Sequence, residues 1–292
     1  MINRSLILIR GAGDLASGIA LRLWRSGFRV AMTELPRPTT IRRTVAFSEA
    51  VTAGEAVVEG VTARLAVDAT EALSLLEQGF LPVQADPDCR CRDALRPLAL
   101  VDAILAKRNL GTAITDAPIV IGVGPGFTAG LDCHAAVETM RGHTLGRVLY
   151  EGSPLPNTNL PGLIGGFAGE RVLRAPADGI FREALSIGCR VKAGDVAGWV
   201  GESPMVCTID GVLRGLLASG IPVHKGMKAG DVDPRGDPSY CHTASDKALA
   251  IGGGVLEAIM HCMGSVHAPC SAGNLPAPNP AAGGTDSSLR SE

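Results

Sequence analysis

The sequence predicts an α/β fold: a parallel sheet covered by helices, followed by a small β unit and a C-terminal helix. Two stretches, residues 5–34 and 116–142, each read as a short apolar strand, a glycine-rich loop and a helix. Short, unalternating, β-branched runs are typical of parallel strands buried on both faces. Further on, the pattern that begins at Asp178-Gly179 recurs at Asp210-Gly211, which indicates a pair of similar short-stranded units. At 292 residues the chain is long enough for two modest domains.

The composition is that of a globular chain. Glycine makes up 37 of 292 residues and aromatic residues only 3%, so tight turns and small side chains dominate. A net charge of −2 gives no general attraction to nucleic acid. No apolar run reaches the roughly 18 residues of a membrane span, and the first apolar run ends at Arg10, too early for a signal-peptide core. We therefore expect a cytoplasmic protein with no nucleic-acid or membrane partner, whose eight cysteines are reduced.

The first strand and loop match a dinucleotide-binding fingerprint. The loop reads Gly11-Ala12-Gly13-Asp14-Leu15-Ala16, and Glu34 closes the second strand at about the spacing where an acid meets a ribose hydroxyl. Asp14 argues against a pyrophosphate, since its carboxylate would repel phosphate, although it is also a good helix N-cap. The pattern predicts a Rossmann-like domain with NAD or another nucleotide bound at Gly11, Gly13, Asp14 and Glu34.

An arginine-rich segment follows the second strand. Arg37, Arg42 and Arg43 are expected beside the ligand crevice at the carboxyl edge of the sheet. Guanidinium groups favour planar or phosphate-bearing anions. We expect Arg42 and Arg43 to bind a small phosphate-bearing ligand; the alternative is an exposed basic loop.

The second glycine-rich loop predicts another anion site. Gly124, Gly126 and Thr128 precede an expected helix, so backbone amides would face a phosphate. His134 and Glu138 would share one face of that helix. The alternative is that the glycines only form a turn and that His134 packs.

Two cysteines follow the strand expected over residues 81–84. Cys89 and Cys91 are flanked by Arg90 and Arg92, which predicts lowered pKa values and thiolate character. Such a pair can carry sulfur or selenium, ligate a soft metal or attack a substrate. No second pair of ligands follows at short spacing, so we predict no metal site; simple packing of two small thiols is the alternative.

The repeat is the most specific pattern in the chain. D-G-Φ-Φ-R-x-x-L-x-x-G-x-x-V-x-x-G, where Φ is apolar, occurs twice with an offset of 32 residues. It resembles the biotinyl/lipoyl carrier fold, a small β barrel-sandwich whose family attaches its cofactor to a lysine between the two copies. No lysine lies between Lys192 and Lys225. We therefore expect no covalent biotin or lipoate and a scaffold or docking role.

These patterns divide the chain into five parts. A helix is expected over residues 98–107, and a docking helix starts at Ser245 or Asp246 and runs to Met260. The expected parts are a Rossmann-like ligand-binding domain (1–150), a linker (151–170), a biotinyl/lipoyl-like β domain (171–235), a loop and docking helix (236–263) and a disordered tail (264–292).

Several runs together resemble the accessory proteins of selenium-dependent molybdenum hydroxylases over residues 5–260. They include GAGDLASG, DPDCRC, IGVGPGFTAGLDCHAAVETMRG, DVDPRGD and SDKALAIGGGVLEAI. The resemblance implies a maturation factor for a client molybdenum hydroxylase that binds the molybdenum cofactor (molybdopterin) at its glycine loops. Cys89 or Cys91 would then transfer sulfur or selenium, with His134 as proton donor.

Two other functions stay open from the sequence. One is an NAD-dependent oxidoreductase, if Glu34 binds ribose; the other is a client-binding chaperone without chemistry. Whether the protein is an enzyme and which oligomer it forms are not predicted.

Overall fold

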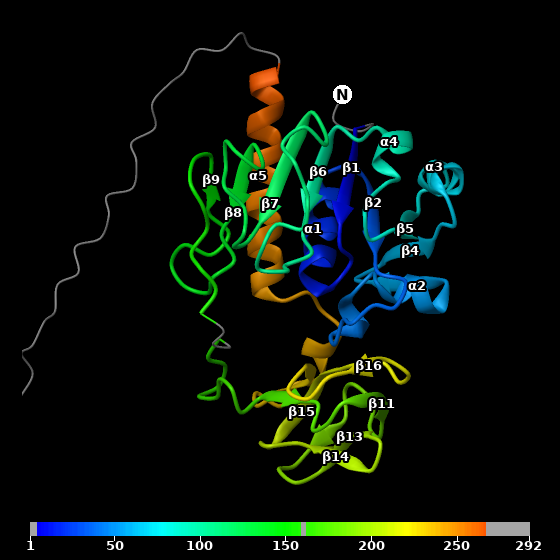
Figure 1. Ribbon diagram of the computed structural model, residues 1–292, viewed down its shortest axis with the longest axis vertical. Coiled ribbons are helices and arrows are strands. Elements are labelled where there is room, and N and C mark those ends of the chain that lie inside the picture. Colours follow the sequence, from blue (N-terminus) through cyan, green and yellow to red (C-terminus); the bar gives the residue numbers. More distant parts are fainter. Residues whose placement is uncertain (1–4, 159–161, 267–292) are drawn as a thin grey trace, which may run out of the picture.

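The computed structural model describes residues 5–158 and 162–266, which form a nine-stranded sheet with helices on both faces and, beside it, two smaller antiparallel sheets (Figure 1). The large sheet has the order β3-β4-β5-β2-β1-β6-β7-β8-β9. Seven neighbouring strands run parallel, whereas the edge strands β3 and β9 pair antiparallel with β4 and β8. The strands are β1 (Leu6–Arg10), β2 (Arg29–Glu34), β3 (Glu55–Val58), β4 (Val61–Leu65), β5 (Leu81–Ala85), β6 (Ala99–Asp102), β7 (Ile119–Val123), β8 (Ala135–Val137) and β9 (Val148–Leu149).

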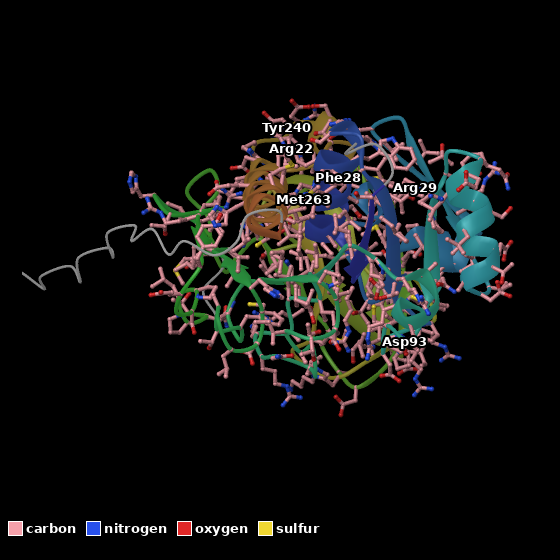
Figure 2. All side chains as sticks on the ribbon, turned by 90° about the horizontal axis from the view of Figure 1, so that it is seen from above. Arg22, Phe28, Arg29, Asp93, Tyr240 and Met263 are labelled. Atoms are coloured by element: carbon pink, nitrogen blue, oxygen red, sulfur yellow. The ribbon has the colours of Figure 1, made fainter. Side chains whose placement is uncertain are left out.

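Each face of the large sheet is buried under its own helices. Ile7 and Ile9 of β1 belong to the core under α1 (Asp14–Arg25) and α5 (Asp246–Val266). Leu6 and Leu8 face the opposite side, because successive side chains of a strand alternate, and pack in the core that α3 (Ala69–Glu77) and α4 (Arg92–Leu95) cover. Seen from above, α1 and α5 lie side by side, with α3 near the far edge of the sheet (Figure 2).

The order of the large sheet reverses between β1 and β6. From β1 the chain continues to β2 on one side, and it later returns to place β6 on the other side of β1. Ligands of open α/β sheets bind at the carboxyl ends of strands at such a reversal. Here those ends are Arg10 and Asp102.

In the two small sheets, equivalent residues of the 32-residue repeat make equivalent hydrogen bonds. The Gly188 amide donates to the Leu213 carbonyl, and the Gly220 amide donates to the Phe181 carbonyl, each at 2.8 Å. The two bonds are related by the offset of 32, so the two copies exchange equivalent contacts. The sheets are β10 (Val172–Arg174), β17 (Lys228–Asp233), β15 (Gly211–Leu216) and β12 (Arg190–Val191), and β14 (Ser203–Val206), β13 (Val196–Val200), β11 (Gly179–Glu183) and β16 (Pro222–Val223).

The small sheets are joined to the rest of the chain by residues just before and within the short 3-10 helix η2 (Arg43–Val45). The Leu216 amide donates to the Ile41 carbonyl at 2.8 Å, and Arg43 Nε donates to the Leu216 carbonyl at 2.9 Å. The Ile41 side chain also packs against the core of the small sheets. Arg42 donates to the carbonyl of Tyr240 in the 3-10 helix η3 (Pro238–Cys241) at 2.9 Å.

The predicted fold class is therefore wrong. The main sheet is mixed instead of wholly parallel, and the two four-stranded sheets form no separate biotinyl/lipoyl-like barrel. The helix predicted to start at Ser245 or Asp246 is α5, which covers one face of the large sheet beside α1 and ends six residues beyond the expected Met260. The division into five domains is not settled by this arrangement and stays a prediction.

Two predicted helices are strands. The residues after the second glycine loop form β8, and the run expected as a helix over 98–107 contains the fully buried β6. Short apolar runs have too few residues for periodicity to separate a buried strand from a helix. Of the expected disordered tail, residues 264–266 are the end of α5, and residues 267–292 lie outside the described part, as do residues 159–161 of the expected linker.

No helix among the described residues is long and apolar enough to cross a membrane.

Candidate functional site

Two adjoining cavities lie at the carboxyl edge of the large sheet, the first of them at the ends of β1 and β6. The first, which we call the switch-point cavity, has a volume of about 710 Å³ and is walled partly by aliphatic side chains. The second, the cationic cavity, has a volume of about 430 Å³. Asp14, Leu15, Ile41 and Lys228 line both. Together the two cavities are of a size that holds small-molecule ligands.

The glycine loop after β1 forms part of the switch-point cavity. Gly11 has φ of 103°, and a side chain there would meet the Ala103 carbonyl oxygen at 2.9 Å, so the position requires glycine. The Glu34 carboxylate accepts hydrogen bonds from the amides of Ala12 (2.9 Å) and Leu35 (2.7 Å). Burial raises the pKa of Glu34 despite these bonds. Glu34 thus holds the loop in place while it lines the cavity.

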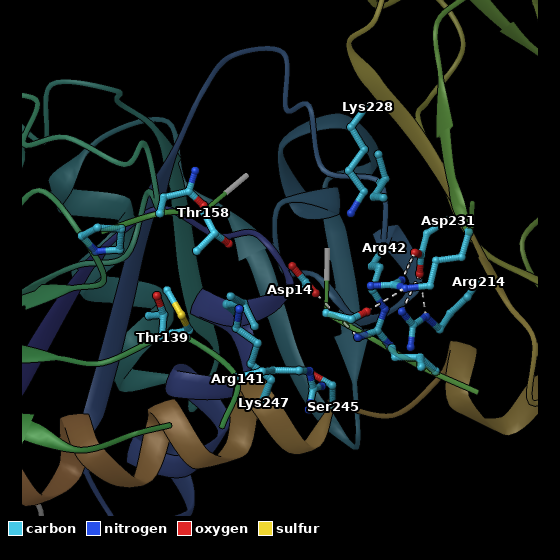
Figure 3. A pocket seen from close by; sticks show the side chains of 18 of the residues that line it. Asp14, Arg42, Thr139, Arg141, Thr158, Arg214, Lys228, Asp231, Ser245 and Lys247 are labelled. Atoms are coloured by element: carbon cyan, nitrogen blue, oxygen red, sulfur yellow. Dashed lines mark hydrogen bonds and ion pairs between the residues drawn. The ribbon is translucent and has the colours of Figure 1, made fainter. Parts of the chain in front are cut away.

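Positive charge dominates the cationic cavity (Figure 3). Its walls carry six cationic side chains and two carboxylates, and the chain positions them from β15, β17, α1, α5 and the intervening loops. The cations are Arg42, Arg141, Arg171, Arg214, Lys228 and Lys247, and the carboxylates are Asp14 and Asp231.

The arginines of this cavity have carboxylate partners. Arg171 and Arg214 both donate to Asp231, with 2.9 Å from Arg214 Nε, and Arg42 lies 3.6 Å from Asp14. Arg42 is only 7% exposed, and its Nε has no hydrogen-bond partner. A buried guanidinium donor without a partner is costly, which favours a group that is not part of the chain at this position.

The two lysines lack such partners. The ammonium groups of Lys228 and Lys247 make no ion pair or hydrogen bond with the described residues. Loss of hydration lowers the pKa of both lysines, and nearby guanidinium groups lower it further, while the carboxylate of Asp14 acts in the opposite direction on both and that of Asp231 on Lys228. In Figure 3 the Lys228 side chain extends into the cavity.

The cysteine pair lies beside the switch-point cavity and does not line it. Cys89 lines a separate cavity of about 200 Å³ together with Arg10, Arg92 and Asp116, whereas Cys91 lines another surface hollow. The Cys91 thiol donates a hydrogen bond to the Cys89 sulfur, which lowers the pKa of Cys89 and raises that of Cys91. Only one of the two thiols therefore gains thiolate character.

The flanking arginines do not cause this shift. Arg90 is exposed and pairs with Asp88 at 2.8 Å. The guanidinium that acts on Cys89 is that of Arg10, which is buried at the end of β1.

Part of the predicted ligand site is brought together. Gly11, Gly13, Asp14 and Glu34 line the switch-point cavity, and Arg42 lines the cationic cavity. Arg43 instead pairs with Glu49 (3.6 Å) and Glu183 and lines neither cavity.

Close packing requires glycine at two positions of the second glycine loop. A side chain on Gly126 would collide with the backbone of Arg108, and one on Gly124 would meet the Thr139 hydroxyl at 2.9 Å. Thr128 shares a hydrogen bond of 2.9 Å with Ser153. None of Gly124, Gly126 and Thr128 lines either cavity.

His134 is not placed beside Glu138 on a helix. Its Nδ1 accepts a hydrogen bond of 3.0 Å from the Val120 amide, and burial lowers its pKa. The Glu138 carboxylate accepts bonds from the amides of Thr139 (2.7 Å) and Leu155 (2.8 Å). His134 is thus occupied in joining the loop to β7 and lines neither cavity.

Five cationic residues of the site were not predicted: Arg141, Arg171, Arg214, Lys228 and Lys247. Arg214 occupies the arginine position of the repeat, which is the one signal in the sequence that could have singled it out. The others come from separate segments with no spacing in common. Among the described residues, no group of three or more His, Cys, Asp or Glu side chains is arranged to hold a metal ion.

Comparison with known proteins gives a close relative without a stated function. No family model matches the chain. The uncharacterized protein YqeB of Escherichia coli (strain K12) is 56% identical over 261 residues, which are 89% of this chain and 48% of the relative. The chain therefore spans about half the length of this relative.

Solved structures give only weak similarity. An aspartoacylase family protein from Mesorhizobium loti has a TM-score of 0.24 at 13% identity, over 79% of this chain and 84% of that one. The ectoine utilization protein EutE (DoeB) of Ruegeria pomeroyi has a TM-score of 0.25 at 12% identity, over 80% and 86% of the two chains. At such low scores, we infer neither fold nor activity from these structures.

These comparisons correct the predicted family. No family model matches the chain, and the relative's name states no function, so the comparisons give no support to an accessory protein of selenium-dependent molybdenum hydroxylases. The solved structures carry other names, aspartoacylase and succinylglutamate desuccinylase. We therefore withdraw that family, together with the maturation role and the handling of molybdenum and selenium. The expected client enzyme is withdrawn with them.

Proposed function

We propose that this protein binds a small anionic ligand whose charged group occupies the cationic cavity and whose uncharged part occupies the switch-point cavity. The observation that carries this proposal is that the ammonium groups of Lys228 and Lys247 are unpaired among the described residues, in a cavity lined by six cations and two carboxylates. Two more carboxylates, Asp233 and Asp246, pair with Arg214 and Arg141, so the excess of positive charge rests on the two lysines. Burying charge without a partner is unfavourable, and a bound anion would offset that penalty.

The hydrogen-bond donors that line the cationic cavity favour a ligand with phosphate or carboxylate groups. Arg42 has a free Nε, and the two lysines supply compact charges from two sides of the cavity. Guanidinium and ammonium groups together are typical of sites that bind such anions. The aliphatic wall of the switch-point cavity, which includes Leu105 and Ile104, suits an uncharged ring or chain. A nucleotide combines both parts, and NAD stays a candidate ligand.

The test is isothermal titration calorimetry with ADP, NAD⁺ and inorganic pyrophosphate. We expect ADP to bind the wild type, and Lys228→Met and Lys247→Met each to weaken binding about tenfold, or about 1.4 kcal/mol. Lys225→Met is the matched control, because it removes the same charge from an exposed turn that lines neither cavity. Binding of none of the three probes, or equal weakening by Lys225→Met, would contradict the proposal.

A further inference from the structure

Cys89 and Cys91 are held in an unusual backbone conformation between β5 and α4. Cys89 has φ of 55°, in the left-handed region that non-glycine residues seldom adopt. Asp86 fixes the turn: its carbonyl accepts from the Cys89 amide (3.0 Å), and its carboxylate accepts from the Cys91 amide (2.8 Å). Such a conformation persists only where the surrounding structure determines it, and it is frequent at functional sites.

The turn brings the two sulfurs together. The Cys91 thiol lies close enough to the Cys89 sulfur to stabilise its thiolate, which lowers the pKa of Cys89, and the Thr33 hydroxyl lowers it as well. Thr33 is buried, and its hydroxyl has no hydrogen-bond partner in the structure. Two sulfurs in contact need little movement to form a bond, because a disulfide requires a specific but short-range geometry.

The guanidinium group of Arg10 lies close to the cysteine pair. Arg10 is 8% exposed, and it is held in place by Asp102 at 3.3 Å and by the Thr112 hydroxyl at 2.9 Å. Its guanidinium also donates to the Pro87 carbonyl at 3.1 Å, directly before the cysteine turn. This charge favours a thiolate over a thiol at Cys89, whereas burial and the Asp86 carboxylate act in the opposite direction. The net shift of the Cys89 pKa is downward, and the Cys91 thiol is its largest cause.

The pair can be reached from one side. Cys89 itself is 1% exposed but lines the cavity of about 200 Å³. Arg10, Asp88 and Leu110 line both this cavity and the switch-point cavity, so the two adjoin. The lining is polar, which suits a small, neutral, hydrophilic reagent better than a large one.

We propose that Cys89 and Cys91 form a thiol–disulfide exchange site for small-molecule disulfides, with Cys89 as the attacking sulfur and Cys91 as the resolving one. The proposal does not depend on the anionic ligand. In the first step Cys89 attacks one sulfur of R–S–S–R, the S–S bond breaks, and RS⁻ leaves. RS⁻ takes the proton of Cys91. The Cys91 sulfur then attacks Cys89, the mixed disulfide breaks, and a second RS⁻ leaves. This RS⁻ takes up from water the proton that Cys89 released on ionising. The dithiol loses two electrons, and R–S–S–R becomes two thiols.

The sequence supplies a direct assay for this disulfide. Trypsin cleaves after Arg64, Arg90 and Arg92, so the reduced protein gives separate peptides 65–90 and 91–92. In the oxidised protein the disulfide joins these two peptides. The full-length protein is treated with 2-hydroxyethyl disulfide, quenched in acid, alkylated with iodoacetamide, digested and analysed by mass spectrometry.

We expect the joined peptide in the wild type, with two thiols released per chain by the pair in addition to any released at other cysteines such as Cys189. Cys91→Ser should stop at a mixed disulfide on Cys89, and Cys89→Ser should leave Cys91 unmodified. Cys241→Ser is the control, because Cys241 is fully buried and has no cysteine beside it, and it should exchange as the wild type does. The wild-type assay needs no variant to fold. Absence of the joined peptide while the exposed Cys189 is modified, or a mixed disulfide on Cys91 in Cys89→Ser, would overturn the proposal.

Discussion

Gly18 on α1 lies against Ala248 on α5 so closely that a methyl group at Gly18 would be 2.5 Å from the Ala248 Cβ. Further along α5, a side chain at Gly252 would meet Arg22 of α1, and one at Gly254 would collide with the Gly146 carbonyl. Glycines therefore set the distance between the two helices and between α5 and the loop before β9. This contact makes α5 a structural part of the main α/β layer.

Gly18→Ala should destabilise the protein. The added methyl group overpacks the contact with α5, which typically costs about 1–3 kcal/mol and exceeds the gain of about 1 kcal/mol from better helix propensity. Urea unfolding followed by circular dichroism measures the free energy of unfolding. Gly253→Ala is the control, since nothing lies within 4 Å of a side chain there, and it should stabilise by about 0.5–1 kcal/mol. A stabilising Gly18→Ala would show that the helices can move apart at little expense.

Asp246 should make the stability depend on acid pH. Arg141 binds both of its carboxylate oxygens at 2.7 Å and lowers the pKa of Asp246 to about 2. Since the pKa in the folded state lies below the unfolded value, about 3.8, the stabilisation is fully present above that value and is lost as pH falls through about 2. Asp246 is largely exposed, so the effect should be small.

We expect Asp246→Asn to flatten the fall in melting temperature between about pH 4 and pH 2. Arg141→Met should flatten it equally, and the double variant should add nothing, because both changes remove the same interaction. Additive effects of the two substitutions would show that the pair is not the cause.

The sequence allowed prediction only of those parts of the site whose residues lie close together along the chain. Gly11, Gly13 and Glu34 belong to one continuous strand, loop, helix and strand, so their spacing defines their arrangement. Arg141 and Lys247 come together only through the docking of α5, and no sequence spacing encodes that contact. The cationic cavity therefore depends on tertiary packing that pattern analysis does not reach.

The prediction of a helix after Gly130 was wrong for a related reason. The run Ala135–Val137 is short and apolar, and its neighbours decide its conformation: β7 pairs with it on one side and β9 on the other. The spacing of His134 and Glu138 was read as one helical face, but in extended backbone it has no such meaning. The family resemblance drawn from short runs of letters likewise finds no support in the comparisons.

Asp14→Asn should tighten the binding of ADP. Asp14 lines both cavities, and its carboxylate opposes an anion while it pairs with Arg42 at 3.6 Å. Removing this charge leaves Arg42 free for the ligand and should strengthen binding about three- to tenfold, which calorimetry would measure. Weaker binding by Asp14→Asn would instead mean that the carboxylate accepts a hydrogen bond from the ligand.

Binding of the anion should weaken as pH rises. The weakening should begin at a lower pH than it would if Lys228 and Lys247 had the pKa of an exposed lysine. Burial lowers the pKa of Lys228 and Lys247, so their ammonium groups lose protons before an exposed lysine does. A bound anion favours the protonated form, and the dissociation constant must therefore rise once the free lysines deprotonate. Calorimetric titration with ADP between about pH 8 and pH 10, where the ADP phosphates are fully ionised, measures this dependence. Lys228→Arg keeps its charge throughout and should flatten the curve, whereas Lys225→Arg on the exposed turn should leave it unchanged. A dissociation constant that is constant over this range in the wild type would mean that neither lysine holds the anion.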